Sequence, residues 1–471
     1  MIAMSEYPGE RLNSFRRFEE KMRAAEMHPL VITMFKRNYL QLLSGSTGSI
    51  SKAQIDAVDD VPDAEKLEGY TKAGEEALAH TAVIKLNGGM GTSMGLEEAK
   101  SLIPVKNELR FIDIIARQIR HMQTAYHDRL PLLLMNSFST RADSLEALAA
   151  YPELAGDLPL DFLQHRIPKV LANDLSPAVW EDDPELEWCP PGHGDIYTAL
   201  VTSGLLERLL AEDIHYAFVS NADNLGAVVD LDILGYFASE RLPFMMEVAD
   251  RTPADRKGGH LALLKDGRLT LRESAQCPDD EKDEFQDITL YRYFNTNSLW
   301  LDLRALKDTL SRYDGILPLP LIRNRKTLDP RDESSPEVYQ LETAMGAAIS
   351  LFENAAALRV PRSRFAPVKT TDDLLAVWSD AYVLTDDYRV VRNPARTLPH
   401  LDVVLDKQHY KFVSQLQERF PSGAPSLLHC ASLRIDGDAR FGSGVVCRGD
   451  VHITVPEGET SRIENDIVLE G

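Results

Sequence analysis

The stretch VIKLNGGMGTSMGLEEAKS, residues 83–101, joins a short apolar run to a loop that contains four glycines and ends near a lysine. The apolar run predicts a buried strand, and clustered glycines indicate backbone that approaches a ligand closely or adopts positive φ. Open α/β sheets bind ligands at the carboxyl ends of their strands. The loop lacks the P-loop pattern and misses G-x-G-x-x-G by one residue, so a tight turn and a nucleotide site both stay open.

From residue 81 onward, apolar runs that resemble strands alternate with stretches of helical periodicity. The expected strands are Thr81–Leu86, Leu130–Asn136, Tyr216–Ser220 and Phe244–Val248, and the expected helices include Phe111–Met122 and Ile196–Leu210. This alternation predicts an α/β fold with a mixed, mainly parallel sheet flanked by helices. Helical spacing also covers residues 8–45, and residues 259–273 and 294–303 predict a hairpin and a returning strand.

The tail of the chain changes character, because apolar residues recur there every six positions in two columns. One column is Leu433, Ala439, Val445 and Val451, and the other is Ile435, Phe441, Cys447 and Ile453. A six-residue period with small turn residues between is typical of a parallel β-helix. We therefore expect three parts: an N-terminal helical segment at 1–70, a main domain at 71–395 and a β-helix at 396–471.

The composition excludes several classes of partner and site. The chain has 471 residues and a formal net charge of −22, so attraction to nucleic acid or to an anionic membrane is not expected. Its four cysteines lie far apart, which argues against thiolate metal sites or disulfides and favours a reducing compartment. The first residues lack the apolar core of a secretion signal, and no apolar run reaches membrane-spanning length. We expect a cytoplasmic protein that binds neither nucleic acid nor membrane.

The stretch WCPPGHGDIY, residues 188–197, predicts a rigid turn that opens a helix. Its prolines fix an extended entry, and Asp195 is expected to cap the helix N-terminus. The free amides of such a terminus can bind a polar ligand. The alternative, favoured when this stretch is taken alone, is a capped loop in which His193 is only exposed.

Two further stretches carry charge that suits phosphates. In FVSNADNL, residues 218–225, Asp223 follows a buried strand and is well placed to hold Mg²⁺, although such residues also simply form turns. In VPRSRFAPVKTTD, residues 360–372, three basic side chains gather in an acidic chain, and a solvated turn is the alternative. Together with the glycine loop and Lys100, these pieces predict transfer of a nucleotidyl group from a nucleoside triphosphate.

Seven motifs in order resemble those of the eukaryotic-type UTP–glucose-1-phosphate uridylyltransferase (UDP-glucose pyrophosphorylase) family. They are KLNGGMGTSMG, PPGHGDIY, FVSNADNLGA, RKGGHL, FNTNSLW, QLETAMGAAI and VPRSRFAPVKTTDDLL. The resemblance implies a nucleotide-diphospho-sugar transferase-like (Rossmann-like) nucleotidyltransferase domain and a left-handed parallel β-helix at the tail. It also implies Mg²⁺-dependent, in-line attack of glucose 1-phosphate on the α-phosphorus of UTP, which gives UDP-glucose and pyrophosphate.

The same resemblance implies a role for individual residues. The nucleotide contacts would be Leu86, Asn87, Gly88, Gly89, Lys100, Gln164, Gly192, Asn221, Ala222, Asp223 and Lys369. The glucose 1-phosphate contacts would be Gly88, Gly89, His193, Asn221, Gly259, Asn297 and Lys369. Lys100, Asp223 and Lys369 would form the catalytic set, with Asp223 as the ligand of Mg²⁺. Gln164 and Gly192 would read the uracil edge, and Ser93 stands where UDP-N-acetylhexosamine pyrophosphorylases usually carry an arginine.

The chain departs from the family pattern in two places. Residues 96–101 replace the usual C-x-G-P-K-S and add Glu97 and Glu98, whose carboxylates either weaken triphosphate affinity or point away. The chain also stops at Gly471, short of the usual apolar terminus, and we expect a monomer or small homo-oligomer. Two alternatives stay open: the same reaction with galactose 1-phosphate or an N-acetylhexosamine 1-phosphate, and a nucleotide-sugar sensor without turnover.

Overall fold

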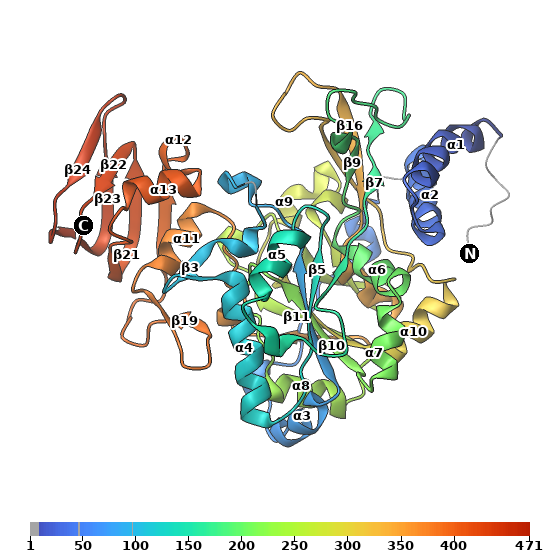
Figure 1. The fold of residues 1–471 in the computed structure, drawn as a ribbon, viewed down its shortest axis with the longest axis horizontal. Helices are drawn as coiled ribbons and strands as arrows, with labels where there is room; N and C mark the ends of the chain where they lie inside the picture. Colours follow the sequence, from blue (N-terminus) through green and yellow to red (C-terminus); the bar gives the residue numbers. More distant parts are fainter. Residues whose placement is uncertain (1–8, 46–47, 97) are drawn as a thin grey trace. The chain divides into compact units, whose positions relative to one another are not determined.

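The computed structural model describes residues 9–45, 48–96 and 98–471, and the chain divides into two compact units. The first unit comprises residues up to 84, 162–219 and 230–360, and the second comprises 85–161, 220–229 and 361–471. Each unit therefore combines segments that lie far apart in the sequence (Figure 1). The division into parts at 1–70, 71–395 and 396–471 stays a prediction.

A ten-stranded sheet forms the centre of the fold. Its main path runs through β1 (Ile55–Asp56), β12 (His260–Leu264), β14 (Tyr293–Asp302), β10 (Tyr216–Asn221), β2 (Thr81–Asn87), β5 (Leu132–Asn136) and β6 (Asp161–Leu163). Off this path, β11 (Phe244–Asp250) pairs with β14 and β17 (Ala356–Arg359), and β13 (Leu269–Arg272) pairs with β12. β14 is antiparallel to β10, β11 and β12, whereas β11 and β17 are parallel, so the sheet is mixed.

The central strands form where the sequence is apolar. β2, β5, β10 and β11 are almost wholly buried, as expected for strands that are covered on both faces. Each lies within two residues of its predicted bounds, and the hairpin of β12 and β13 with the returning strand β14 is also confirmed. These findings confirm the α/β fold with a central sheet flanked by helices (Figure 1).

The helices divide between the units as follows. The first unit contains α1 (Gly9–Ala24), α2 (Pro29–Leu43), α3 (Thr71–Leu78), α6 (Ile196–Thr202), α7 (Leu205–Ala211), α8 (Leu231–Ser239), α9 (Lys282–Phe285) and α10 (Leu303–Arg312). The second contains α4 (Phe111–Tyr126), α5 (Arg141–Leu148), α11 (Thr371–Trp378), α12 (Lys407–Tyr410) and α13 (Val413–Arg419). Among the described residues, every helix is too short or too polar to span a membrane.

Two helical predictions had different outcomes. The spacing in residues 8–45 corresponds to α1 and α2, which pack through buried Phe18, Phe35 and Tyr39; residue 8 itself lies outside the described residues. The single helix expected over 196–210 is instead two helices, α6 and α7. Gly204 separates them because its φ of 70° is incompatible with a continuous helix.

Smaller sheets complete both units. In the first unit, β8 (Val170–Leu171), β16 (Glu337–Glu342) and β15 (Ile322–Thr327) form one sheet, and β7 (Ile167–Pro168) pairs with β9 (Trp188–Cys189). In the second unit, β3 (Pro104–Lys106) pairs with β4 (Leu109–Arg110), and β18 (Tyr382–Leu384) pairs with β19 (Val390–Arg392). β3 and α11 matter most below, because they border the predicted catalytic residues.

The tail folds into short strands that form two parallel sheets beside α11 and α13 (Figure 1). One sheet contains β20 (Asp402–Leu405), β21 (Ser426–Asp436), β23 (Val446–Thr454) and β25 (Val468–Glu470), and the other contains β22 (Asp438–Phe441) and β24 (Thr460–Ile463). The register of β21 and β23 aligns Leu433 with Val451 and Ile435 with Ile453, eighteen residues further on. In each apolar column, a residue of β21 therefore pairs with the residue of β23 that lies three six-residue repeats later.

Candidate active site

The predicted site residues divide between the two units. The second unit holds Leu86, Asn87, Gly88, Gly89, Lys100, Asn221, Ala222, Asp223 and Lys369, and the first holds Gln164, Gly192, His193, Gly259 and Asn297. The whole predicted catalytic set therefore belongs to the second unit.

The glycine loop after β2 is closed on itself by backbone hydrogen bonds. The N–H of Lys100 donates to the carbonyl of Gly89 over 3.2 Å. Gly95 has a φ of 78°, and a Cβ there would lie 2.7 Å from the ring of Phe412, so this position requires glycine. The closure brings Lys100 back to the pair Gly88–Gly89, which follows the strand.

Part of this loop lies outside what the structure describes. Glu97 is not among the described residues, and neither is the side chain of Ser93. Glu98 is exposed, and its carbonyl accepts a hydrogen bond from the N–H of Gly91 over 3.2 Å. The backbone of Glu98 thus helps to close the loop.

The buried side chain of Asn87 makes hydrogen bonds to neighbouring residues within the protein. Its Nδ2 donates to Oδ1 of Asn136 and to Oγ of Ser144, both over 2.8 Å. The Oγ1 of Thr140 donates to the carbonyl of Asn87 over 2.8 Å. Because these bonds commit the buried side chain to the fold, a ligand in the loop would meet backbone here.

Asp223 lies just after β10, and its carboxylate contacts two lysines. The Nζ of Lys100 donates to Oδ2 over 2.7 Å, and the Nζ of Lys369 lies 3.6 Å from the same oxygen. The side chains of Lys100 and Asp223 are 16% and 14% exposed, whereas that of Lys369 is 56% exposed. Two cations beside one carboxylate leave a local excess of positive charge, which favours a polyphosphate.

The other carboxylate oxygen of Asp223 has the properties of a metal ligand. Oδ1 is buried and has no hydrogen-bond partner within the described part of the chain. A buried polar atom without a partner is costly, so such an atom in a native site calls for a ligand. Carboxylate oxygens are the ligands that Mg²⁺ prefers, and the residues therefore fit a Mg²⁺ ion that phosphate oxygens also coordinate.

Asn224 brings the segment before Lys369 next to Asp223. Its Nδ2 donates to the carbonyl of Arg364 over 3.1 Å, and its Oδ1 accepts the N–H of Ala366 over 3.0 Å. The N–H of Val368 donates to the carbonyl of Asp223 over 3.2 Å. One amide side chain thus joins two segments that the sequence keeps far apart.

Helix α11 begins directly after Lys369 and Thr370, and both of its ends are held. At the N-terminal end, Oδ2 of Asp373 accepts the N–H groups of Lys369 and Thr370 over 2.8 and 2.9 Å. At the C-terminal end, the Nζ of Lys106 donates to the carbonyls of residues 377–379 over 3.0, 3.3 and 2.5 Å. Burial lowers the pKa of Lys106 to about 8.

In the first unit, Thr343 shapes the turn at Gly192. Gly192 has a φ of 80°, and a Cβ there would lie 2.5 Å from the carbonyl oxygen of Thr343, so glycine is required. That carbonyl also accepts the N–H of Gly194 over 2.9 Å. The Nδ1 of His193 accepts the N–H of Met345 over 3.1 Å, so the neutral ring carries its proton on Nε2.

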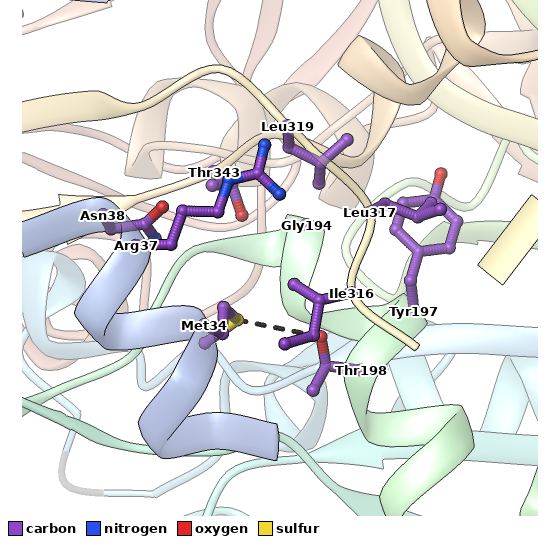
Figure 2. A pocket seen from close by; sticks show the side chains of 10 residues that line it. All are labelled: Met34, Arg37, Asn38, Gly194, Tyr197, Thr198, Ile316, Leu317, Leu319 and Thr343. Atoms are coloured by element: carbon purple, nitrogen blue, oxygen red, sulfur yellow. Dashed lines mark hydrogen bonds between the residues drawn. The ribbon is translucent and has the colours of Figure 1, made fainter. Parts of the chain in front are cut away.

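Figure 2 shows the pocket behind this turn, where Gly194 and the start of α6 face α2. The hydroxyl of Thr198 contacts Sδ of Met34 over 3.7 Å. The Nδ2 of Asn38 is buried there, and no described residue bonds to it. Helix α2 therefore packs directly against the segment that carries His193.

Asp195 occupies the N-cap position of α6, as predicted, but its side chain does not cap the helix. A 3₁₀ turn at His193–Asp195 precedes α6, and the carboxylate makes no capping hydrogen bond. It is instead fully buried, where it accepts the backbone N–H of His165 over 2.7 Å and lies 2.9 Å from its Nδ1. The contact with His165 takes the place of the cap, and the pair fixes the segment that carries half-buried Gln164.

Gly259 directly precedes β12, and Asn297 lies in β14 where its register with β11 shifts. A Cβ at Gly259 would lie 2.5 Å from Oε2 of Glu273, so that carboxyl packs against the glycine. Burial raises the pKa of Glu273 to about 7. Asn297 has a φ of 58°, which asparagine tolerates, and its Oδ1 accepts a hydrogen bond from Asn295 over 2.9 Å.

Several residues that shape the site were not predicted from the sequence. They are Lys85, Lys106, Asn224, Glu273, Thr343 and Met345. Lys85 is buried and donates to Oγ of Ser220 and to the carbonyl of Ala227, both over 2.7 Å. A lysine inside an otherwise apolar strand was the one signal available, because a buried ammonium must have partners.

The chain is similar to known proteins over most of its length. The profile of the family described as UTP–glucose-1-phosphate uridylyltransferase matches residues 32–448. The Solanum tuberosum protein of that name is 40% identical over 433 residues, which cover 91% of this chain and 89% of the relative. The Hordeum vulgare protein of that name is 42% identical over 394 residues, which cover 83% and 81%.

Solved structures give the same result. A mutant UDP-glucose pyrophosphorylase from Leishmania major, in complex with UDP-glucose, has a TM-score of 0.90 and 43% identity, covering 97% of this chain and 98% of that one. A UDP-glucose phosphorylase from Trypanosoma brucei has a TM-score of 0.88 and 41% identity, covering 98% and 100%. The likeness therefore includes the fold as well as the sequence.

Proposed function

Because the chain belongs to the UTP–glucose-1-phosphate uridylyltransferase family, we propose that it transfers the uridylyl group of UTP to glucose 1-phosphate. The products are UDP-glucose and pyrophosphate. The observation that carries this proposal is the contact of Asp223 with both Lys100 and Lys369, directly after a strand and in the same unit as the glycine loop. Binding of a sugar alone would not need two lysines on one carboxylate.

The reaction needs little covalent help from the protein. A phosphate oxygen of glucose 1-phosphate forms a bond to the α-phosphorus of UTP, and the bond from that phosphorus to the pyrophosphate oxygen breaks. The attacking oxygen is already anionic near neutral pH, so no general base is required. Alignment of the two phosphates and neutralisation of their charge are the remaining tasks.

We assign the neutralisation to the catalytic set. Lys100 is held near Gly89 by its own backbone and contacts the triphosphate, while the more exposed Lys369 stabilises negative charge on the transferring phosphates. Asp223 would hold Mg²⁺, and its buried, unpartnered Oδ1 supports this role. When bound, the ion supplies further charge neutralisation at the phosphate oxygens.

Recognition of the base and sugar is assigned to the first unit. The side-chain amide of Gln164 can donate and accept at the uracil edge, next to the backbone of Gly192. In this proposal His193 contacts a sugar-phosphate oxygen, and the hydrogen bond from the N–H of Met345 to Nδ1 fixes the orientation of its ring. Gly259 and Asn297 complete the sugar contacts in this proposal.

We also propose how the chain divides into domains, where the protein is located and how it assembles. The pairing of parallel strands eighteen residues apart supports a left-handed β-helix at 396–471, after a catalytic domain at 71–395 and a helical segment at 1–70. Four buried, free thiols support a location in the reducing cytoplasm. We propose a monomer or small homo-oligomer, which light scattering of the full-length protein tests directly.

The decisive experiment measures pyrophosphate release from UTP. Release that depends on both glucose 1-phosphate and Mg²⁺ is expected, and it should stop when the metal is chelated. Galactose 1-phosphate and N-acetylglucosamine 1-phosphate serve as competing substrates, and a higher kcat/KM for either would reassign the sugar. Absence of pyrophosphate with every sugar phosphate would support a sensor without turnover.

A further inference from the structure

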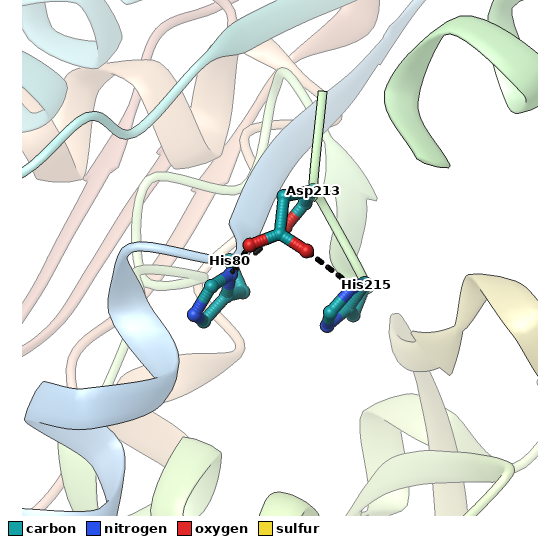
Figure 3. Close-up of side chains that lie close together, drawn as sticks. All are labelled: His80, Asp213 and His215. Carbon is teal, nitrogen blue, oxygen red and sulfur yellow. Dashed lines mark hydrogen bonds and ion pairs between the residues drawn. The ribbon is translucent and has the colours of Figure 1, made fainter. Parts of the chain in front are cut away.

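His80, Asp213 and His215 form a cluster that the proposed reaction does not use (Figure 3). His80 directly precedes β2, His215 directly precedes β10, and Asp213 lies between α7 and β10. The Nδ1 of His80 lies 3.0 Å from Oδ2 of Asp213, and the Nε2 of His215 lies 2.9 Å from Oδ1. Two imidazole nitrogens therefore face opposite oxygens of one carboxylate.

The backbone fixes this cluster without a ligand. The N–H groups of His215 and Tyr216 both donate to the carbonyl of His80, over 2.8 and 2.9 Å. Asp213 has a φ of 60°, a conformation that aspartate tolerates better than most residues. The two imidazole rings stack with centroids 5.1 Å apart and planes at 9°. An ion that binds here would order few additional groups, which favours affinity.

We propose that His80, Asp213 and His215 bind a divalent transition-metal ion of the Zn²⁺ class. Imidazole nitrogen and carboxylate oxygen are ligands that Zn²⁺, Co²⁺, Ni²⁺ and Cu²⁺ share. At bond lengths of about 2.1 Å, neighbouring ligands lie about 3.4 Å apart around a tetrahedral ion and about 3.0 Å apart around an octahedral ion. The contacts of 3.0 and 2.9 Å match the octahedral spacing, and the carbonyl oxygen of Asp213, 2.9 Å from Nδ1 of His80, is a further potential ligand.

Binding exchanges hydrogen bonds for metal bonds. His80 must carry its proton on Nε2, so that the lone pair of Nδ1 faces the ion. The side chains of His80, Asp213 and His215 are 39%, 70% and 24% exposed, so water can complete the coordination. Such a site is open on one side and exchanges its ion with solution.

The surrounding charges permit a cation. Arg304 is 3.3 Å from a carboxylate oxygen of Asp302, and Lys307 is 2.6 Å from one of Glu207. Each nearby cation is thus offset by its own carboxylate, and Asp213 supplies the negative charge of the site.

The bound ion would join the starts of β2 and β10. Because the ligands come together only in the folded chain, the ion stabilises that state, and the stabilisation grows with the logarithm of its concentration over its Kd. The site takes no part in uridylyl transfer, and its success or failure is independent of the proposed function.

The test uses the full-length chain without a tag, since a histidine tag would itself bind the metal. Zn²⁺ is titrated by calorimetry into the wild type, His80→Ala, His215→Ala and Asp213→Asn. His121→Ala, which removes an exposed histidine on α4, is the matched control. Circular dichroism establishes that each variant is folded, and asparagine at 213 keeps both the shape and the tolerance of positive φ.

We expect one ion per chain in the wild type and in His121→Ala, and binding weaker by about tenfold or more in each cluster variant. The electron paramagnetic resonance spectrum of bound Cu²⁺ should show coupling to two imidazole nitrogens in the wild type and to one in His80→Ala. Zn²⁺ should raise the Tm of the wild type but not that of a His80→Ala, His215→Ala double variant. Unchanged affinity and Tm shift in the folded double variant, or no saturable binding by the wild type, would overturn the proposal.

Discussion

The Nζ of Lys100 lies 2.7 Å from Oδ2 of Asp223, although 123 residues separate the two in the chain. Both side chains are mostly buried, at 16% and 14% exposure, so each charge depends on the other for compensation. Lys369 adds a second cation 3.6 Å from the same oxygen. One carboxylate therefore contacts both lysines of the proposed catalytic set.

Lys369→Ala should lower kcat by roughly 10²–10³-fold, because the ammonium acts on charge that builds up on the transferring phosphates. Stability should change little, since this side chain is 56% exposed. Steady-state assays of pyrophosphate release check the rate, with Lys72→Ala as the control at an exposed lysine on α3. A kcat close to that of the wild type would remove Lys369 from the mechanism.

Asp223→Asn should abolish Mg²⁺-dependent turnover while the protein stays folded, because the amide keeps the shape of the side chain but not its charge. Turnover is measured across a series of Mg²⁺ concentrations, and circular dichroism reports the fold. Asp279→Asn, at a side chain that is 93% exposed, is the control. Full activity of Asp223→Asn at low Mg²⁺ would place the metal site elsewhere.

Gln164→Ala should narrow the preference for UTP over CTP by about tenfold or more, since a site built to pair a polar edge rejects bases that leave its groups unmatched. The measurement is the ratio of kcat/KM for the two triphosphates. If that ratio does not change, base recognition belongs to the backbone at Gly192.

The stability of the ligand-free protein should depend on Glu273 between about pH 4.5 and 7. In that window the folded carboxyl, with a pKa of about 7, keeps a proton that the unfolded chain, at 4.5, has released. The free energy of unfolding therefore falls as pH rises, by up to about 3 kcal/mol.

Glu273→Gln removes this dependence, because an amide does not ionise. Urea unfolding of the wild type and the variant at pH 5 and pH 8 checks the expectation. The variant should lose less stability than the wild type between the two pH values. Equal losses would show that the carboxyl ionises as freely in the folded protein as in the unfolded chain.

Lys106→Met should weaken the C-terminal end of α11, because the three carbonyls that Lys106 contacts lose their donor. We expect a loss of about 1–3 kcal/mol in stability, together with a lower kcat at nearly unchanged KM for UTP. Lys106→Arg, which keeps a cation and several donors, should recover part of both losses. Wild-type Tm and kcat in Lys106→Met would show that Lys106 does not hold this helix.

Much of the fold could be predicted because its strands are apolar and its turns contain glycine. The bounds of β2 and β10 follow from buried runs that end at asparagine or glycine. The break between α6 and α7 was missed because one glycine in a helical pattern is often tolerated, and φ at Gly204 depends on its surroundings.

The site was predictable only in part, for a different physical reason. Lys100, Asp223 and Lys369 stand in recognisable motifs, but their meeting at one oxygen depends on the tertiary fold. Asn224 looked like a turn residue, and its bonds to a segment 140 residues away have no local signature. The burial of Asp195 against His165 likewise overrode the local preference for a helix cap.

The three-segment build of the second unit has a consequence for protein synthesis. Residues 85–161 leave the ribosome long before residues 361–471 exist, yet both belong to one compact unit. Folding of domains during translation proceeds from the N-terminus, so this unit must wait for the last part of the chain. A chain that stops at residue 360 contains every segment of the first unit but lacks the largest segment of the second. Such a chain also lacks Lys369, so we expect it to form no UDP-glucose.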